Sequence, residues 1–152
     1  MNKLKRRKIM FGTKKKVAKK NSNKTIGNIT ESYIVEAFSK FNYWAKLMPT
    51  NFSGQPCDIV AIKDTKNVLC DAKNVEHGNT FYFNRIEYNQ ENCLKLALHY
   101  NGIKNCGFVI YFKEYNTLKW LPYLIVETAK ENGISGVKID SLEDFSQFIK
   151  EI

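Results

Sequence analysis

Three charged side chains stand where apolar neighbours predict buried β-strands. Asp58 opens the run Asp58–Lys63, whereas Asp71 and Lys73 lie within the run Val68–Lys73. A buried, unpaired carboxylate is costly, so each aspartate needs a cation, a hydrogen-bond donor or a metal ion. Oxygen-rich sites of this kind suit Mg²⁺ or Mn²⁺. The two aspartates therefore predict a site for a divalent metal ion.

The turn between the two runs decides whether these side chains meet. We expect a four-residue loop at 64–67, which would set Asp58 opposite Lys73. Asp71 lies two residues from Lys73, and alternate residues of a strand share a face. Two carboxylates and an ammonium group would then converge on one side of a sheet.

A third carboxylate comes from the expected first helix. Apolar residues recur at helical spacing over 26–41, and Glu31 lies close to this stripe in the first turns. Alternatively, Glu31 is a solvated charge on the helix surface, and Asp58 is a cap at the start of a strand. For Asp71 and Lys73 the alternative is an exposed strand end.

The remaining pattern predicts an α/β fold with a mixed central β-sheet flanked by helices. The expected elements, in chain order after the first helix, are an edge strand at 43–48, the two buried strands, an irregular stretch at 74–83, a helix over 85–100, and strands Cys106–Phe112 and Leu118–Leu121. Two short helices follow, and we expect the second to open at Ser141 with Asp144 in a capping box.

Positive charge is concentrated at the N-terminus. The 152-residue chain has a net charge of +9, but residues 1–24 hold 11 Lys/Arg and no acid, whereas residues 25–152 hold 13 bases and 15 acids. Clustered cations gain binding free energy by releasing counterions from phosphates. We therefore expect residues 1–24 to form a disordered arm that binds nucleic acid, ahead of one folded domain at 25–152. A solubilising or targeting tail is the alternative. The candidate contacts in the arm are Lys5, Arg6, Arg7, Lys8, Lys14, Lys15, Lys16, Lys19 and Lys20.

The composition argues against two classes of protein. No stretch approaches the ~20 consecutive apolar residues of a membrane span, so we expect no membrane partner. The four cysteines form no CxxC pair and have no zinc spacing. We expect them to be reduced residues in the core of a cytoplasmic protein.

The order of these motifs resembles the PD-(D/E)xK nuclease superfamily. Gln55-Pro56-Cys57-Asp58 followed by Asp71-Ala72-Lys73 resembles its signature, and Glu31 matches the acid of its upstream helix. The later segments Asn79–Phe83 and Asn89-Gln90 resemble elements of RecU-type Holliday junction resolvases. The segment 53–73 is also similar to archaeal junction resolvases.

The resemblance implies a restriction-endonuclease-like fold and a nuclease domain that hydrolyses DNA phosphodiesters with Mg²⁺ or Mn²⁺. It implies that Asp58, Asp71 and the Ala72 carbonyl bind the metal ion. Glu31 would bind a second ion or order water. Lys73 would orient water or offset developing charge, and Gln90 would position the DNA backbone or the water.

The resemblance also implies a role in DNA recombination or repair, with four-way junctions as the substrate. A junction is two-fold symmetric, so we expect a homodimer that presents two sites. Four aromatic residues, Phe81, Tyr82, Phe83 and Tyr88, flank the expected site; they would either stack on unpaired bases or pack in the core and its rim.

Three departures from the family pattern keep alternatives open. Asp71 stands where the family has glutamate, and Asn89 where it has histidine. The segment between Trp44 and Asp58 is too short for the long stalk of RecU-type proteins. The alternatives are a PD-(D/E)xK endonuclease that acts on duplex DNA, and a non-catalytic nucleic-acid-binding module of the same fold.

Overall fold

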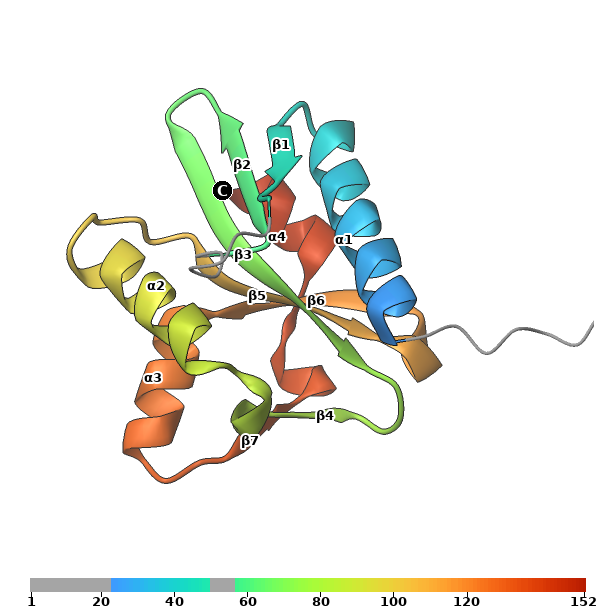
Figure 1. Ribbon diagram of the computed structural model, residues 1–152, viewed down its shortest axis with the longest axis vertical. Coiled ribbons are helices and arrows are strands. Elements are labelled where there is room, and N and C mark those ends of the chain that lie inside the picture. Colours follow the sequence, from blue (N-terminus) through green and yellow to red (C-terminus); the bar gives the residue numbers. More distant parts are fainter. Residues whose placement is uncertain (1–22, 50–56) are drawn as a thin grey trace, which may run out of the picture.

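The computed structural model describes residues 23–49 and 57–152, which form a mixed β-sheet flanked by helices (Figure 1). The helices are α1 (Asn23–Lys40), α2 (Tyr88–His99), α3 (Tyr123–Glu131) and α4 (Phe145–Glu151). The strands are β1 (Trp44–Leu47), β2 (Ile59–Lys63), β3 (Lys66–Val75), β4 (Thr80–Tyr82), β5 (Cys106–Phe112), β6 (Thr117–Pro122), β7 (Gly136–Lys138) and β8 (Glu143–Asp144). The predicted α/β class is confirmed. The candidate contacts of the basic arm lie outside the described residues.

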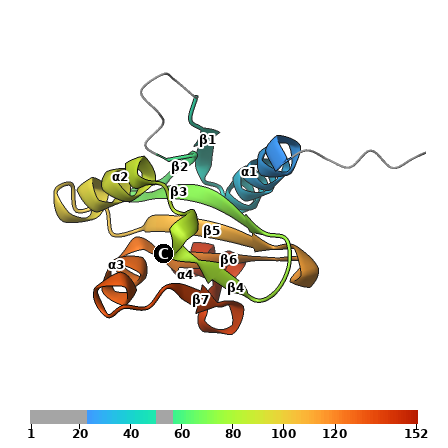
Figure 2. The same ribbon diagram turned by 60° about the horizontal axis from the view of Figure 1, so that its bottom comes forward.

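The main sheet has the strand order β1-β2-β3-β5-β6-β8, and β4 pairs with β7 in a separate two-stranded sheet. Strands β3 and β5 run parallel along the middle of the main sheet, as Figure 2 shows, whereas the other neighbours are antiparallel. Parallel strands need a crossover connection. The segment from β4 to α2 makes it, and it places α2 against β5 with the start of the helix next to Lys73 of β3.

Two apolar clusters cover the two faces of the sheet. Helices α2 and α3 contribute to one cluster, together with Phe108 and Ile110 of β5. Helices α1 and α4 contribute to the other, together with Val109 of the same strand. Successive strand residues point to opposite faces, so β5 is buried on both sides and reads as a continuous apolar run.

The β2–β3 hairpin is tighter than predicted. Lys63 pairs with Lys66, so the turn holds only Asp64 and Thr65. Asp64 has a φ of +54°, in the left-handed region that hairpin turns of two residues require. Aspartate tolerates this region better than most residues, and that tolerance lets the turn close without glycine. The predicted four-residue loop is wrong.

Other boundaries also differ from the predictions. The expected irregular stretch at 74–83 is partly ordered, since β3 continues to Val75 and β4 begins at Thr80. The last helix begins at Phe145 and not at Ser141, because the two residues before it first pair with β6 as β8. The Asp144 carboxylate contacts Lys119 at 2.8 Å and makes no cap hydrogen bond, so the predicted capping box is wrong.

The cysteines are free, as predicted, and Cys57, Cys70 and Cys106 are buried while Cys93 is half-buried. Within the described ranges, no helix is long and apolar enough to cross a membrane.

Candidate active site

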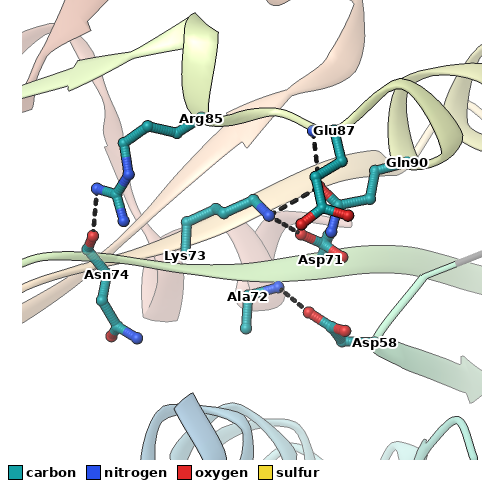
Figure 3. Close-up of polar contacts among 8 residues, drawn as sticks. All are labelled: Asp58, Asp71, Ala72, Lys73, Asn74, Arg85, Glu87 and Gln90. Carbon is teal, nitrogen blue, oxygen red and sulfur yellow. Dashed lines mark hydrogen bonds and ion pairs between the residues drawn. The ribbon is translucent and has the colours of Figure 1, made fainter. Parts of the chain in front are cut away.

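Asp58 and Asp71 lie beside one another at the open end of the β2–β3 hairpin (Figure 3). The register pairs Ile59 with Cys70, and one further step sets Asp58 beside Asp71. The predicted pairing of Asp58 with Lys73 is wrong by two residues, because the turn is two residues shorter than expected. The correction brings the two carboxylates closer together than the sequence argument did.

A backbone group of β3 holds the Asp58 side chain in place. The Ala72 N–H donates to Oδ2 of Asp58 at 2.7 Å. Strand β2 begins at Ile59, so Ala72 has no strand partner on that side, and the carboxylate takes the position that a strand carbonyl would occupy. The N–H and C=O of a strand residue point to the same side. The Ala72 carbonyl therefore faces the same open edge as Asp58.

Asp71 is a buried carboxyl group with an incomplete set of partners. The residue is 1% exposed, and its Oδ2 lies 2.7 Å from Lys73 Nζ. Its Oδ1 finds no hydrogen-bond donor among the described residues. Burial raises the pKa of Asp71 from 3.8 to about 7, Lys73 opposes that shift, and the charge of Asp58 adds to it. A buried carboxylate that lacks donors is poised to accept a cation.

Lys73 joins the strand to helix α2. Its Nζ contacts Asp71 and also donates to Oε1 of Gln90 at 2.8 Å (Figure 3). Only 12% of the Lys73 side chain is exposed. The predicted placement of Asp71 and Lys73 on one face of β3 is thus confirmed by their contact.

Gln90 has a structural partner that the sequence analysis missed. The Glu87 carboxylate accepts from the Gln90 backbone N–H, and Oε1 of Gln90 accepts from the Glu87 N–H at 3.2 Å. This reciprocal pair is a capping box at the start of α2. The signal was present in the sequence, since Glu87 and Gln90 have the three-residue spacing of that motif. The helix cap therefore fixes the amide that holds Lys73.

Helix α1 is tied to β3 next to the site. Oγ1 of the buried Thr30 donates to Oδ1 of Asn74 at 2.6 Å, a link the sequence analysis did not foresee. The neighbouring Glu31 is half-buried, and burial, then the negative charge of Asp58, raises its pKa. Glu31 is thus within electrostatic range of Asp58. Across residues 23–49 and 57–152, however, no three acidic, histidine or cysteine side chains gather closely enough to form a metal cluster.

The four flanking aromatic residues divide into two pairs. Phe81 and Phe83 are buried in the cluster beneath α2 and α3, so packing is their role. Tyr82 and Tyr88 are 54% and 81% exposed. The exposed pair is available to a ligand, and the buried pair is not.

The donor set fits a hard divalent cation. Asp71 offers a buried oxygen to which no described residue donates, Asp58 lies beside it, and the Ala72 carbonyl faces the same edge. Carboxylate and carbonyl oxygens are the ligands that Mg²⁺ and Mn²⁺ take, usually with several waters.

Comparison with solved structures identifies the fold. The chain is similar to Hjc, a Holliday junction resolvase of the archaeon Archaeoglobus fulgidus, with a TM-score of 0.60 and 12% sequence identity. The match covers 84% of this chain and 98% of that one. The expected nuclease-like fold of the archaeal junction resolvases is thereby confirmed. No protein-family model matches the sequence, and no curated protein matches it either.

Proposed function

We propose that this protein is a metal-dependent DNA endonuclease that resolves four-way junctions in recombination or repair. The observation that carries the proposal is Asp71, a carboxyl group buried beside Asp58, one oxygen of which has no donor among residues 23–49 and 57–152. Such a group destabilises the fold unless a ligand uses it. The likeness of the fold to that of the Archaeoglobus fulgidus resolvase supports this class of reaction.

We assign each residue of the site a role that agrees with its contacts. Asp58, Asp71 and the Ala72 carbonyl would hold Mg²⁺ or Mn²⁺, with Glu31 as an outer carboxylate near Asp58. Bound there, the ion supplies Lewis-acid polarisation of the phosphate and hydroxide near neutral pH. Removing one carboxylate would remove a ligand and would also reduce repulsion of the phosphate.

Lys73 and Gln90 would act on the phosphate from beside Asp71. The Lys73 ammonium group, held by Asp71 and Gln90, offers a fixed positive charge to the charge that develops on the phosphorane. Because Gln90 is clamped by its helix cap, the ammonium group is positioned before the substrate arrives, and less reorganisation is needed during the reaction.

Binding of the junction requires more than this site. Residues 25–152 are close to neutral, so we assign phosphate tracking to the basic arm at 1–24 and shape selection to a homodimer. Deleting residues 1–24 should weaken DNA binding and make its salt dependence shallower. Gel-shift titrations at several salt concentrations measure this, and an unchanged slope would remove the arm from the interface.

The deciding experiment compares a labelled four-way junction with a matched duplex, in Mg²⁺ and in EDTA. We expect Mg²⁺-dependent cleavage and a kcat/KM at least about tenfold higher on the junction, or ~1.4 kcal/mol of differential transition-state binding. Equal rates on both substrates would favour the second candidate, a duplex endonuclease. The short segment between Trp44 and Asp58, which leaves no room for a stalk, is the observation in its favour. Binding without cleavage in Mg²⁺ or Mn²⁺ would favour a non-catalytic module.

A further inference from the structure

Two basic side chains, Lys73 and Arg85, lie on the same side of β3, and they differ in how many N–H donors they have left for a substrate. Lys73 already contacts Asp71 and Gln90, which occupies two of its three N–H donors. Arg85, which follows β4, is exposed and forms no ion pair with a carboxylate in the described part of the chain. The positive charge of Arg85 is therefore not compensated locally.

Two contacts hold the Arg85 side chain in one orientation. Its guanidinium donates to the backbone carbonyl of Asn74, the residue after Lys73, and lies 5.7 Å from the centre of the Phe81 ring. Phe81 is fully buried, so this ring is a rigid support. Figure 3 shows Arg85 on the same side of β3 as Lys73 and Gln90. A guanidinium has five N–H donors, and the carbonyl uses one.

The residue type supports the same conclusion. Arg85 is the single arginine among the 13 basic residues of 25–152; the others are lysines. Arginine presents a planar fork that grips phosphate oxygens in pairs, whereas lysine acts as a point charge. A guanidinium that is exposed, oriented and without a carboxylate partner among the described residues is suited to a phosphodiester group.

We propose that Arg85 is a phosphate-binding site for the DNA strand that is cut, one to three nucleotides from the scissile phosphate. The inference rests on the proposed function for its substrate class. Asp71 and Asn74 are three residues apart on β3, or roughly 10 Å along an extended strand. Phosphates of one DNA strand advance about 3.4 Å along the duplex axis per nucleotide and are spaced more widely than that through space, so this separation spans at most about three nucleotides.

The test combines a protein change with a change of single phosphates. Full-length wild type and Arg85→Gln are titrated, in Ca²⁺, against four-way junctions that carry one neutral methylphosphonate at successive positions around the branch point. We expect one position at which the wild type loses about tenfold in affinity. Arg85→Gln should bind the unmodified junction about tenfold more weakly than the wild type does. A methylphosphonate at the sensitive position should then weaken its binding no further, because the substitution and the methylphosphonate remove the same contact.

Salt dependence and two further variants complete the design. Arg85→Gln should lower the slope of log Kd against log salt by about 1, whereas Arg85→Lys should keep most of it. Lys150→Gln is the matched control, since Lys150 also lies over a ring, that of Phe41, at 5.9 Å, but on α4 at the other face of the sheet. It should leave both measurements unchanged. Equal Tm values for wild type and Arg85→Gln show that the variant is folded.

The outcomes separate this inference from the proposed function. Equal methylphosphonate penalties at every position in the wild type and in Arg85→Gln would overturn the phosphate site and leave the nuclease proposal standing. If the affinity losses in Ca²⁺ follow the expected pattern but the wild type never cuts DNA in Mg²⁺ or Mn²⁺, the nuclease proposal is overturned and the phosphate site stands. A wild type that binds no junction would overturn both.

Discussion

The two faces of β3 have opposite character. Toward α1 and α4 the strand presents Cys70 and Ala72, which pack in an apolar cluster with Phe38. Toward α2 it presents Asp71 and Lys73, a buried ion pair in which one aspartate oxygen has no donor within the described part of the chain. Apolar burial stabilises the first face, whereas desolvation of charge destabilises the second. The comparison separates the side of the sheet that supports the fold from the side that we propose performs chemistry.

Aromatic packing gives the apolar face its rigidity. The rings of Trp120 and Phe148 stack with centroids 4.1 Å apart, and Phe38 meets Phe145 edge-on at 5.2 Å. Such pairs contribute about 0.5–1.5 kcal/mol each beyond their buried area. This face can therefore offset the cost of the charged face behind it.

The sharpest test of the comparison is Asp71→Asn on the charged face. It removes a proposed metal ligand, so kcat should fall by at least about 10⁴-fold while junction binding persists. Cleavage and gel-shift assays on the same preparation measure both. Asp64→Asn, in the exposed turn of the same hairpin, is the control and should cleave normally. Wild-type cleavage by Asp71→Asn would end the site assignment.

Phe38→Ala on the apolar face should produce the reverse pattern. Phe38 is fully buried, and truncation of such a ring costs about 3–5 kcal/mol of the free energy of unfolding. Urea denaturation measures the loss. The fraction that stays folded should cleave with the kcat of the wild type, since no proposed catalytic group is touched. A fully folded Phe38→Ala protein without activity would show that the two faces are not separable.

The pH dependence of stability should come from the charged face. Because the pKa of Asp71 rises from 3.8 to about 7 on folding, the folded state holds a proton that the unfolded state releases. In EDTA, the contribution of Asp71 to the free energy of unfolding is fully present below about pH 4. That contribution is lost as the pH rises through 7. The loss is roughly 4 kcal/mol at most.

Denaturant titrations of wild type and Asp71→Asn from pH 4 to pH 8 isolate this contribution, because the other groups cancel in the difference. The difference should shrink or vanish when Mg²⁺ is present at pH 8, since a cation replaces the proton. A difference that does not change with pH would mean that Asp71 is ionised throughout.

The smallest effect on activity is expected at Gln90, where α2 meets the candidate site. Gln90→Ala removes the acceptor for Lys73 and one half of the capping box, so kcat should fall about 10–100-fold and stability by about 1 kcal/mol. Gln90→Glu keeps an acceptor for both donors and should retain stability. A Gln90→Ala protein that loses stability but no kcat would restrict Gln90 to capping.

Most of the fold could be predicted because apolar patterns are long and regular. The strand Cys106–Phe112 was placed at its observed bounds, since β5 is buried on both faces and has an uninterrupted apolar run. The error at Asp64 has a physical origin as well. A two-residue turn and a four-residue turn fit the same flanking pattern, and only the left-handed backbone of Asp64 selects the shorter one.

The site was predictable in its members and not in its contacts. Asp58, Asp71 and Lys73 stand out because charge is rare inside apolar strands. Thr30 and Asn74 could not be found that way, because their hydrogen bond joins residues 44 positions apart and depends on how α1 crosses the sheet. Glu87 was within reach of sequence reasoning, since its spacing to Gln90 is that of a capping box.

Oε1 of Gln90 accepts two hydrogen bonds, and these determine the orientation of the side-chain amide. Both neighbours, the Lys73 ammonium group and the Glu87 N–H, are donors, so the oxygen must face them and the NH₂ group must point elsewhere. That NH₂ group has no acceptor among residues 23–49 and 57–152. In the site that we propose, Gln90 would therefore meet a substrate as a donor, suited to a phosphate oxygen, and its oxygen is not oriented to accept a hydrogen bond from the attacking water.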